Sequence, residues 1–367
     1  MIPSPPPFDR VLAQLLAELG AFEVTIVPSE KDADRDFRVI GAAGADFGLD
    51  VKEYKRITPS TAESACMTLK RHAESTGSQP VLFASVVSDR TADIATKHGV
   101  SWIDYAGNCR LVFPPYGIYV RRSGIVNPFG KQLPKVLNVF SAKSSRVVRA
   151  MLQEPLRGWQ LNELARYPGV RVSPGLMSRI KRTLVEGGYA TMLGGQLRLK
   201  RPDDLLDDWA SHYRAHKPQE HSFYMRGELE QVEQQVANWC SKSAAPFALS
   251  RFSAAWRLAP EVRYNAASFM VPPAAILPQP SIDLTTNYGA RKVDSGANLI
   301  LQIADDESYF SNRQFETIQA TSPLQTYLDL RAMDGRGEEA ANAVYEKYLK
   351  QPFAEATERM AEHHEAN

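Results

Sequence analysis

The sequence is poor in cysteine and contains no long apolar run. It has only three cysteines, Cys66, Cys109 and Cys240, and no C-x-x-C pair. An odd number of widely spaced cysteines argues against a disulfide framework and against a zinc ribbon. No segment approaches the run of about 18 apolar residues that a membrane span requires, and the proline-rich start lacks the basic and apolar regions of a signal peptide. We therefore expect a cytoplasmic protein with no membrane association.

Length and composition indicate a folded protein with more than one domain. Hydrophobic residues make up 44% of the chain and charged residues 23%, which is ordinary for globular proteins and unlike disordered ones. At about 100–200 residues per domain, a chain of 367 residues is expected to contain two or three domains.

The net charge of +1 conceals a strongly basic middle segment. From Arg110 to Arg201 there are 17 Lys and Arg against 3 Asp and Glu, a local charge of +14, which leaves −13 for the rest of the chain. Residues 202–367 carry 15 basic and 24 acidic side chains. A local basic excess is typical of proteins that bind phosphate backbones, because binding releases counterions. Polyanion binding is therefore expected in the middle of the chain.

Residues 1–134 are predicted to form an α/β domain with a mixed sheet. Apolar residues at helical spacing indicate a helix over 8–20. Strands are then predicted at 22–27, 36–40, 47–54, 80–87, 101–105 and 108–113, and helices at 61–75 and 90–99. This α-β-β-β-α-β-α-β order is that of an α/β domain. The proline- and glycine-rich residues 114–134 are predicted to be a loop or linker.

Residues 135–202 show the element order of a winged helix-turn-helix. Helices are predicted at 145–152, 158–167 and 173–186, and strands at 189–193 and 196–200 flank Gly194-Gly195, a two-residue connection that closes tight hairpins. Ser173 and Pro174 are suited to the N-cap and first position of the third helix. In a helix-turn-helix this helix enters the major groove of DNA. The sequence therefore predicts a DNA-binding domain, although winged helices also bind proteins and a basic helix face can simply be solvated.

The candidate DNA-contacting residues lie on and around this third helix. Its apolar residues form one stripe, which leaves a basic and hydrogen-bonding surface for base edges and phosphates. We expect base or groove contacts from Arg171, Ser173, Ser178, Arg179 and Arg182. Lys181 and the wing residues Arg198, Lys200 and Arg201 are expected to contact the DNA backbone.

The N-terminal domain carries a D-x-K triplet, Asp50-Val51-Lys52, on a predicted strand. Residues two apart on a strand share a face, and metal-dependent phosphodiester cleavage uses carboxylates for Mg²⁺ together with a lysine. Asp36 could supply a second carboxylate, so Asp36 and Asp50 are candidate metal ligands and Asp36, Asp50 and Lys52 candidate catalytic residues. The segment resembles the PD-(D/E)xK restriction-endonuclease-like fold. The alternative is an exposed strand edge with alternating charges.

A turn in this domain has two interpretations. An apolar strand ends at Asp104 before Gly107-Asn108. An Asx-turn explains this pattern, and the alternative is that Asp104 and Asn108 line a pocket.

Strings along the chain resemble bacterial antitoxins of the AbiEi type from type IV toxin–antitoxin systems. They are VSWIDYAGN at 100–108, the winged-helix segment, LLDDWASHY at 205–213 and SPLQTYLDLRAMDGRGEEAA at 322–341. The resemblance implies a DNA-binding autorepressor whose C-terminal domain, here the acidic α+β residues 203–367, counteracts a nucleotidyltransferase toxin. The shortest members lack the N-terminal D-x-K domain.

Charged residues of the last string could face a partner: Asp329, Arg331, Arg336, Glu338 and Glu339. Helix capping and local ion pairs explain them equally well.

Three functional hypotheses follow. The first is a non-enzymatic regulator that binds double-stranded DNA, requires no cofactor and forms a homodimer on paired half-sites. The second is a Mg²⁺-dependent nuclease that the winged helix delivers to DNA. The third makes the acidic C-terminal domain an adaptor for another protein.

Overall fold

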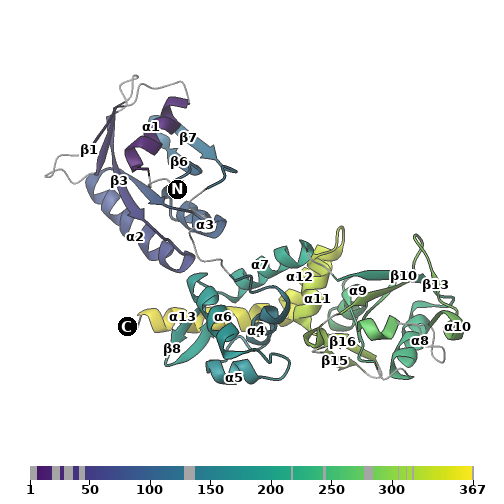
Figure 1. Cartoon of the computed structure of the whole chain (residues 1–367). Coiled ribbons are helices and arrows are strands. Elements are labelled where there is room, and N and C mark those ends of the chain that lie inside the picture. Colours follow the sequence, from purple (N-terminus) through teal and green to yellow (C-terminus); the bar gives the residue numbers. More distant parts are fainter. Residues whose placement is uncertain are drawn as a thin grey trace. The chain divides into compact units, whose positions relative to one another are not determined.

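The computed structural model divides the chain into two compact units. It describes residues 6–18, 25–28, 36–40, 46–127, 137–215, 218–242, 245–276, 284–304, 306–310, 312–315 and 318–365. The first unit comprises Met1–Val136 with Val185–Gly188, and the second comprises Leu137–Leu184 with Tyr189–Asn367. Figure 1 shows both units.

A mixed sheet forms the centre of the first unit. Its strands are β1 (Thr25–Pro28), β2 (Phe37–Ile40), β3 (Asp46–Tyr54), β4 (Gln79–Ala84), β5 (Ser101–Asp104), β6 (Cys109–Phe113) and β7 (Ile118–Arg122). They lie side by side in chain order. The pairs β3–β4 and β4–β5 are parallel, and the outer pairs are antiparallel. The predicted mixed sheet is therefore present in the described part of this unit.

Helices cover the two faces of this sheet. Helix α1 (Phe8–Glu18) packs on one face, and α2 (Pro59–Thr76) and α3 (Asp89–Lys97) pack on the other. Along β4, Phe83 belongs to the core under α1, whereas Leu82 belongs to the core under α2 and α3. Both faces of the central parallel strands are thus buried, as parallel sheets require.

The prediction of a loop over 114–134 is wrong for Ile118–Arg122, which forms β7 against β6. Gly117 has a φ of +68°, which lets the chain turn after Pro114–Tyr116 and return as a strand. Ile118 is buried in the core under α1, while Tyr119 is exposed. The alternation typical of a strand is therefore present, but it is concealed among prolines and glycines.

The second unit begins with α4 (Ala142–Gln153), α5 (Leu161–Arg166) and α6 (Pro174–Glu186), followed by the hairpin β8 (Ala190–Leu193) and β9 (Gln196–Leu199). These elements occur in the order predicted for residues 135–202. The predicted helix over 158–167 is too long at its start. Trp159 instead exchanges both backbone hydrogen bonds with Leu197, at 2.9 and 2.8 Å, and so adds an extended segment to the hairpin.

A second mixed sheet lies in the C-terminal part of this unit. Its strands are β10 (Glu220–Tyr224), β11 (Ala248–Leu249), β12 (Ala267–Val271), β13 (Arg291–Lys292), β14 (Leu299–Ile303), β15 (Asn312–Phe315) and β16 (Ile318–Thr321). Their order is β13-β10-β14-β12-β11-β16-β15. The helices are α7 (Pro202–Ala215), α8 (Leu229–Lys242), α9 (Arg251–Leu258), α10 (Leu284–Tyr288), α11 (Pro323–Arg331), α12 (Gly337–Tyr348) and α13 (Lys350–Glu365).

The second unit joins two of the predicted domains, residues 135–202 and 203–367, in one compact body. Helix α11 packs on α4, α7, α9 and α12, and α13 packs on α7 and β9. None of the helices in the described part of the chain has the length and apolar character of a membrane span.

Candidate functional site

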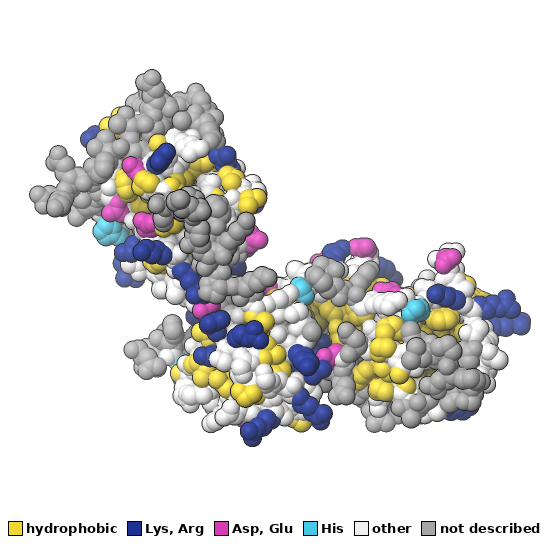
Figure 2. All heavy atoms as spheres, viewed as in Figure 1, with side chains coloured by type: hydrophobic (Ala, Val, Ile, Leu, Met, Phe, Trp, Pro, Cys, Tyr) yellow, Lys and Arg dark blue, Asp and Glu magenta, His cyan; other side chains and the backbone are white. Residues whose placement is uncertain are grey.

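Helix α6 presents a polar, basic face at the surface of the second unit. Ser173 precedes the helix, and its Oγ accepts a hydrogen bond of 3.3 Å from the backbone N–H of Leu176, which caps the first turn. Met177, Ile180 and Leu184 are buried at helical spacing. The opposite face is exposed and consists of Ser178, Arg179 and Arg182, whereas Lys181 is half-buried. Figure 2 shows Lys and Arg side chains spread over the part of this unit that carries α4, α5 and α6.

The turn before α6 holds Arg171 outward. Its φ of +43° lies in the left-handed region, which is uncommon for a residue other than glycine. Both neighbours, Val170 and Val172, are buried, and the N–H of Val172 donates to the carbonyl of Ala165 at 3.0 Å. Because the backbone is anchored on both sides, the exposed Arg171 side chain is presented next to the start of α6.

The predicted wing residues are less exposed than those of α6. Arg198, Lys200 and Arg201 are all half-buried. The guanidinium of Arg198 donates to Oε1 of Gln196 at 2.7 Å, and Arg201 lies 3.8 Å from a carboxylate oxygen of Asp204. The basic side chains that are most exposed to solvent are therefore those of α6 and of the turn before it.

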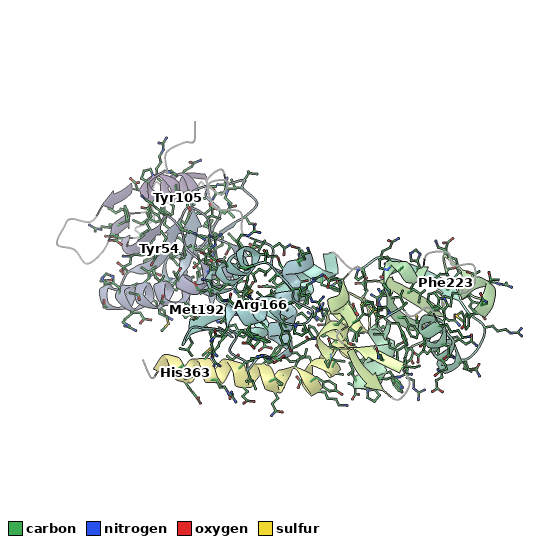
Figure 3. The ribbon with its side chains drawn as sticks, turned by 60° about the horizontal axis from the view of Figure 1, so that its bottom comes forward. Tyr54, Tyr105, Arg166, Met192, Phe223 and His363 are labelled. Carbon is green, nitrogen blue, oxygen red and sulfur yellow. The ribbon has the colours of Figure 1, made fainter. Side chains whose placement is uncertain are left out.

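The hairpin also packs against the C-terminal helix α13. A hollow of about 290 Å³ between them is lined in part by Leu193, Arg198, Arg359 and His363. Figure 3 labels Met192 on β8 and His363 near the end of α13. The hairpin thus follows α6 in the chain and packs against the C-terminal helix α13.

A buried polar cluster connects α4 with α7 and α11. The hydroxyl of Tyr213 donates to Oδ1 of Asp329 at 2.6 Å, and Nε2 of Gln325 donates to the same oxygen at 2.9 Å. Arg149 of α4 is buried, and its guanidinium lies 5.1 Å from the centre of the Trp209 ring. Burial raises the pKa of Asp329 to about 6, although the bonds it accepts act in the opposite direction. Burial lowers the pKa of Arg149.

A second contact joins α4 to the C-terminal part of the unit. Nε of Arg146 donates to a carboxylate oxygen of Asp306 at 2.7 Å, and both side chains are largely buried. Helix α4 is therefore fixed to the C-terminal part by charged and hydrogen-bonding groups as well as by apolar packing. The position of α4 depends on groups from that part.

Sequence reasoning did not single out Arg149, Tyr213 or Gln325. Tyr213 lies in the string 205–213 and Gln325 in the string 322–341. A signal was present, because Gln325 and Asp329 are spaced i, i+4 on a helix that is buried from Leu324 to Leu330. Polar residues on such a helix are expected to bond one another or a neighbouring element.

The structure corrects one of the predicted partner-facing residues. Asp329 is only 1% exposed and therefore cannot reach a partner in this conformation. The other four lie nearer the surface in ion pairs, Arg331 with Glu338 at 3.0 Å and Arg336 with Glu339 at 3.2 Å. These are the local ion pairs that the alternative interpretation predicted. Whether the four residues also contact a partner stays a prediction.

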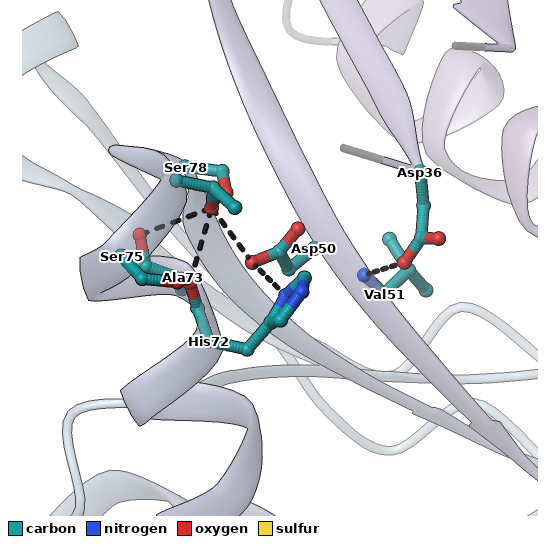
Figure 4. A network of polar contacts seen from close by, with 8 residues as sticks. Asp36, Asp50, Val51, His72, Ala73, Ser75 and Ser78 are labelled. Atoms are coloured by element: carbon teal, nitrogen blue, oxygen red, sulfur yellow. Dashed lines mark hydrogen bonds and ion pairs between the residues drawn. The ribbon is translucent and has the colours of Figure 1, made fainter. Parts of the chain in front are cut away.

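Asp50 of the D-x-K triplet is buried and bonded to α2. It is 1% exposed, and its Oδ2 lies 2.9 Å from Nδ1 of His72 and accepts from the hydroxyl of Thr76 at 3.1 Å. Its Oδ1 has no hydrogen-bond partner among the described residues. Figure 4 shows the carboxylate of Asp50 turned toward His72. The acidic member of the triplet thus joins β3 to α2.

The other residues of the nuclease hypothesis have different environments. A carboxylate oxygen of Asp36 accepts from the backbone N–H of Val51 at 2.8 Å (Figure 4), and Lys52 is exposed. The described residues contain no cluster of three or more His, Cys, Asp and Glu side chains suited to a metal ion. Donors already occupy one carboxylate oxygen of Asp36 and one of Asp50, so a Mg²⁺ ion would bind through the remaining oxygens, and the metal assignment of both residues stays a prediction. A catalytic role for Asp36, Asp50 and Lys52 stays a prediction.

Residues 198–350 match a protein-family model described as a transcriptional regulator, the AbiEi antitoxin of a type IV toxin–antitoxin system. The matched segment runs from β9 to the first residue of α13 and includes both Tyr213 and Asp329. It supports the resemblance to AbiEi-type antitoxins for this part of the chain. Helices α4 to α6 and the first unit lie outside the match. No curated protein and no solved structure matched the chain.

Proposed function

We propose that the protein is a DNA-binding transcriptional regulator of the AbiEi antitoxin type, which represses the operon that encodes it. The observation that carries this proposal is the match of residues 198–350 to the antitoxin and regulator family. The matched segment is packed on a helical segment that has the composition and exposure of a DNA reader. The regulator acts without a metal or other cofactor.

In this proposal α4, α5, α6 and the β8–β9 hairpin form a winged helix-turn-helix. Helix α6 lies in the major groove, where Ser178, Arg179 and Arg182 reach bases and phosphates from its exposed face. Arg171 and the capped start at Ser173 lie at the end of α6 that approaches the groove. Lys181, Arg198, Lys200 and Arg201 contact the backbone. A two-fold dimer would place two such helices on successive half-sites.

The C-terminal part of the second unit is proposed to respond to a nucleotidyltransferase toxin. Tyr213, Asp329 and Gln325 form one buried cluster with the α4 residue Arg149. A change in α7 or α11 would therefore be transmitted to α4, the first helix of the proposed DNA-binding segment. The exposed ion pairs of Arg331 and Arg336 are the surface that we assign to the partner.

Gel-shift measurements with the DNA upstream of the gene test this proposal. The full chain is mixed with the upstream duplex and with an unrelated duplex at fixed salt, in Mg²⁺ or in EDTA. We expect a discrete shift of the upstream duplex in both buffers, with the DNA left intact. Equal affinity for the two duplexes would contradict a specific regulator, and cutting that requires Mg²⁺ would favour the nuclease hypothesis.

A further inference from the structure

Two arginines face each other across the last two strands of the first unit. In the antiparallel pair β6–β7, Arg110 lies directly opposite Arg121. The neighbours of Arg110, Cys109 and Leu111, are buried in the core under α1, and Val120, which precedes Arg121, packs against the same core. Because side chains alternate along a strand, both arginines project from the other face of the sheet.

This arrangement is unfavourable by itself. Like charges directly opposite on paired strands destabilise the sheet. Among the described residues no carboxylate pairs with Arg110 or Arg121. Arg38 of the same sheet, by contrast, donates from Nε to Asp46 at 2.7 Å across the pair β2–β3. Within the described residues, the sheet therefore neutralises one exposed arginine but gives the opposed pair no counter-charge.

An exposed aromatic ring lies beside the arginine pair. Tyr119 is 67% exposed and is paired with Val112, two residues along each strand from the arginines. A residue two positions away on a strand projects from the same face. On the face opposite α1, β6 and β7 thus present two guanidinium groups and one phenol ring. This combination is suited to phosphates and sugars.

We propose that this face, defined by Arg110, Arg121 and Tyr119, is a second DNA-contacting surface that binds the phosphate backbone of a duplex. The proposal rests on the proposed function, because the duplex is the one that α6 reads. Phosphates supply a counter-charge for both guanidinium groups, and binding releases counterions. Since both units belong to one chain, this contact adds to the affinity of α6 as an intramolecular event. Protection of the edge strand β7 from aggregation is the competing role for the arginines.

The test compares the full-length protein with the double variant Arg110→Gln/Arg121→Gln on short and long duplexes. Both duplexes contain the upstream site, and the long one adds flanking sequence. We expect the variant to lose about tenfold in affinity for the long duplex and to lower the slope of log K against log salt by about two, one for each lost phosphate contact. Its affinity for the short duplex should stay unchanged.

A matched control is Lys70→Gln/Arg71→Gln, which removes the same charge from an exposed part of α2 in the same unit. It should bind both duplexes like the wild type. Equal binding of the long duplex by wild type and Arg110→Gln/Arg121→Gln overturns the inference and leaves the proposed function standing. Absence of any binding by the wild type overturns both proposals.

Discussion

Tyr213 of α7 and Asp329 of α11, which lie 116 residues apart in the sequence, share a hydrogen bond of 2.6 Å in the interior of the second unit. Gln325 donates to both partners, at 2.9 Å in each case. Oδ2 of Asp329 has no hydrogen-bond partner among the described residues. The carboxylate is thus held on one side and desolvated on the other, which explains why burial dominates its pKa.

The raised pKa of Asp329 predicts a specific pH dependence of stability. The pKa is about 6 in the folded protein, against about 3.9 in an unfolded chain. Between these values the folded state binds more protons, so the free energy of unfolding falls as pH rises, by up to about 1.4 kcal/mol per pH unit. In Asp329→Asn this component should vanish, because the amide oxygen still accepts from Tyr213 and Gln325 but does not titrate. Urea unfolding at several pH values measures the effect.

The control for this experiment is Asp334→Asn, since the side chain of Asp334 is 92% exposed. It should keep the wild-type pH profile. Parallel profiles for Asp329→Asn and the wild type would show that Asp329 does not titrate in this range.

Removing the Tyr213 hydroxyl should destabilise the second unit. Tyr213→Phe leaves the buried Asp329 carboxylate with Gln325 as its remaining donor, and loss of a partner from a buried polar group costs about 1–3 kcal/mol. The pKa of Asp329 should also rise further. Denaturant unfolding at neutral pH measures the cost, with Tyr224→Phe on an exposed ring as the control. Equal stability of the two variants would mean that the bond contributes little.

Two glycines predict opposite effects of the same substitution. A Cβ at Gly337 would lie 2.5 Å from the backbone oxygen of Leu330 and 2.9 Å from Cβ of Met333. Gly337→Ala should therefore force α11 and α12 apart and cost about 1–3 kcal/mol. Gly175 in the first turn of α6 has open space around it, so Gly175→Ala should raise stability by about 0.4–1 kcal/mol. Thermal unfolding of both variants measures this difference, and a neutral Gly337→Ala would contradict the close packing.

Asp50 and Lys52 provide a test that separates a structural role from a catalytic one. Asp50→Ala removes the acceptor for His72 and Thr76 and should lower the free energy of unfolding by about 1–3 kcal/mol. Lys52→Ala, at an exposed position, should leave stability unchanged. Affinity for the upstream duplex should be the same in both variants. A nuclease would instead lose Mg²⁺-dependent cleavage in both.

Local signals in the sequence were sufficient for several elements. Capping residues and apolar spacing predicted a helix over 173–186, and α6 covers Pro174–Glu186. At Asp104, Oδ1 accepts from the N–H groups of Ala106 and Asn108 at 2.9 Å each, which is the Asx-turn interpretation. Such features depend on residues a few positions apart, which a single sequence displays directly.

Non-local pairing explains what the sequence did not predict. Gly158–Trp159 was assigned to a helix. The strand partner of Trp159 is Leu197, which lies 38 positions further along the chain, so the local sequence does not reveal this pairing. Asp329 was grouped with charged residues that could face a partner or form local ion pairs, but its partner Tyr213 comes from a helix far away in the sequence. Strand β7 is defined by its pairing with β6. The prolines and glycines on both sides of β7 made the segment look like a loop in the sequence. By contrast, helical spacing alone was enough to predict that Arg179 and Arg182 are exposed, because it involves no distant partner.

The most direct test of a DNA-reading α6 is the affinity of Arg179→Ala for the upstream duplex and for unrelated DNA at one salt concentration. We expect a loss of about 1–3 kcal/mol on the upstream duplex and little change on unrelated DNA, because a base contact is lost. Arg263→Ala, which removes an exposed arginine elsewhere in the second unit, should bind like the wild type. Unchanged affinity of Arg179→Ala for the upstream duplex would contradict the assignment of α6 as the reading helix.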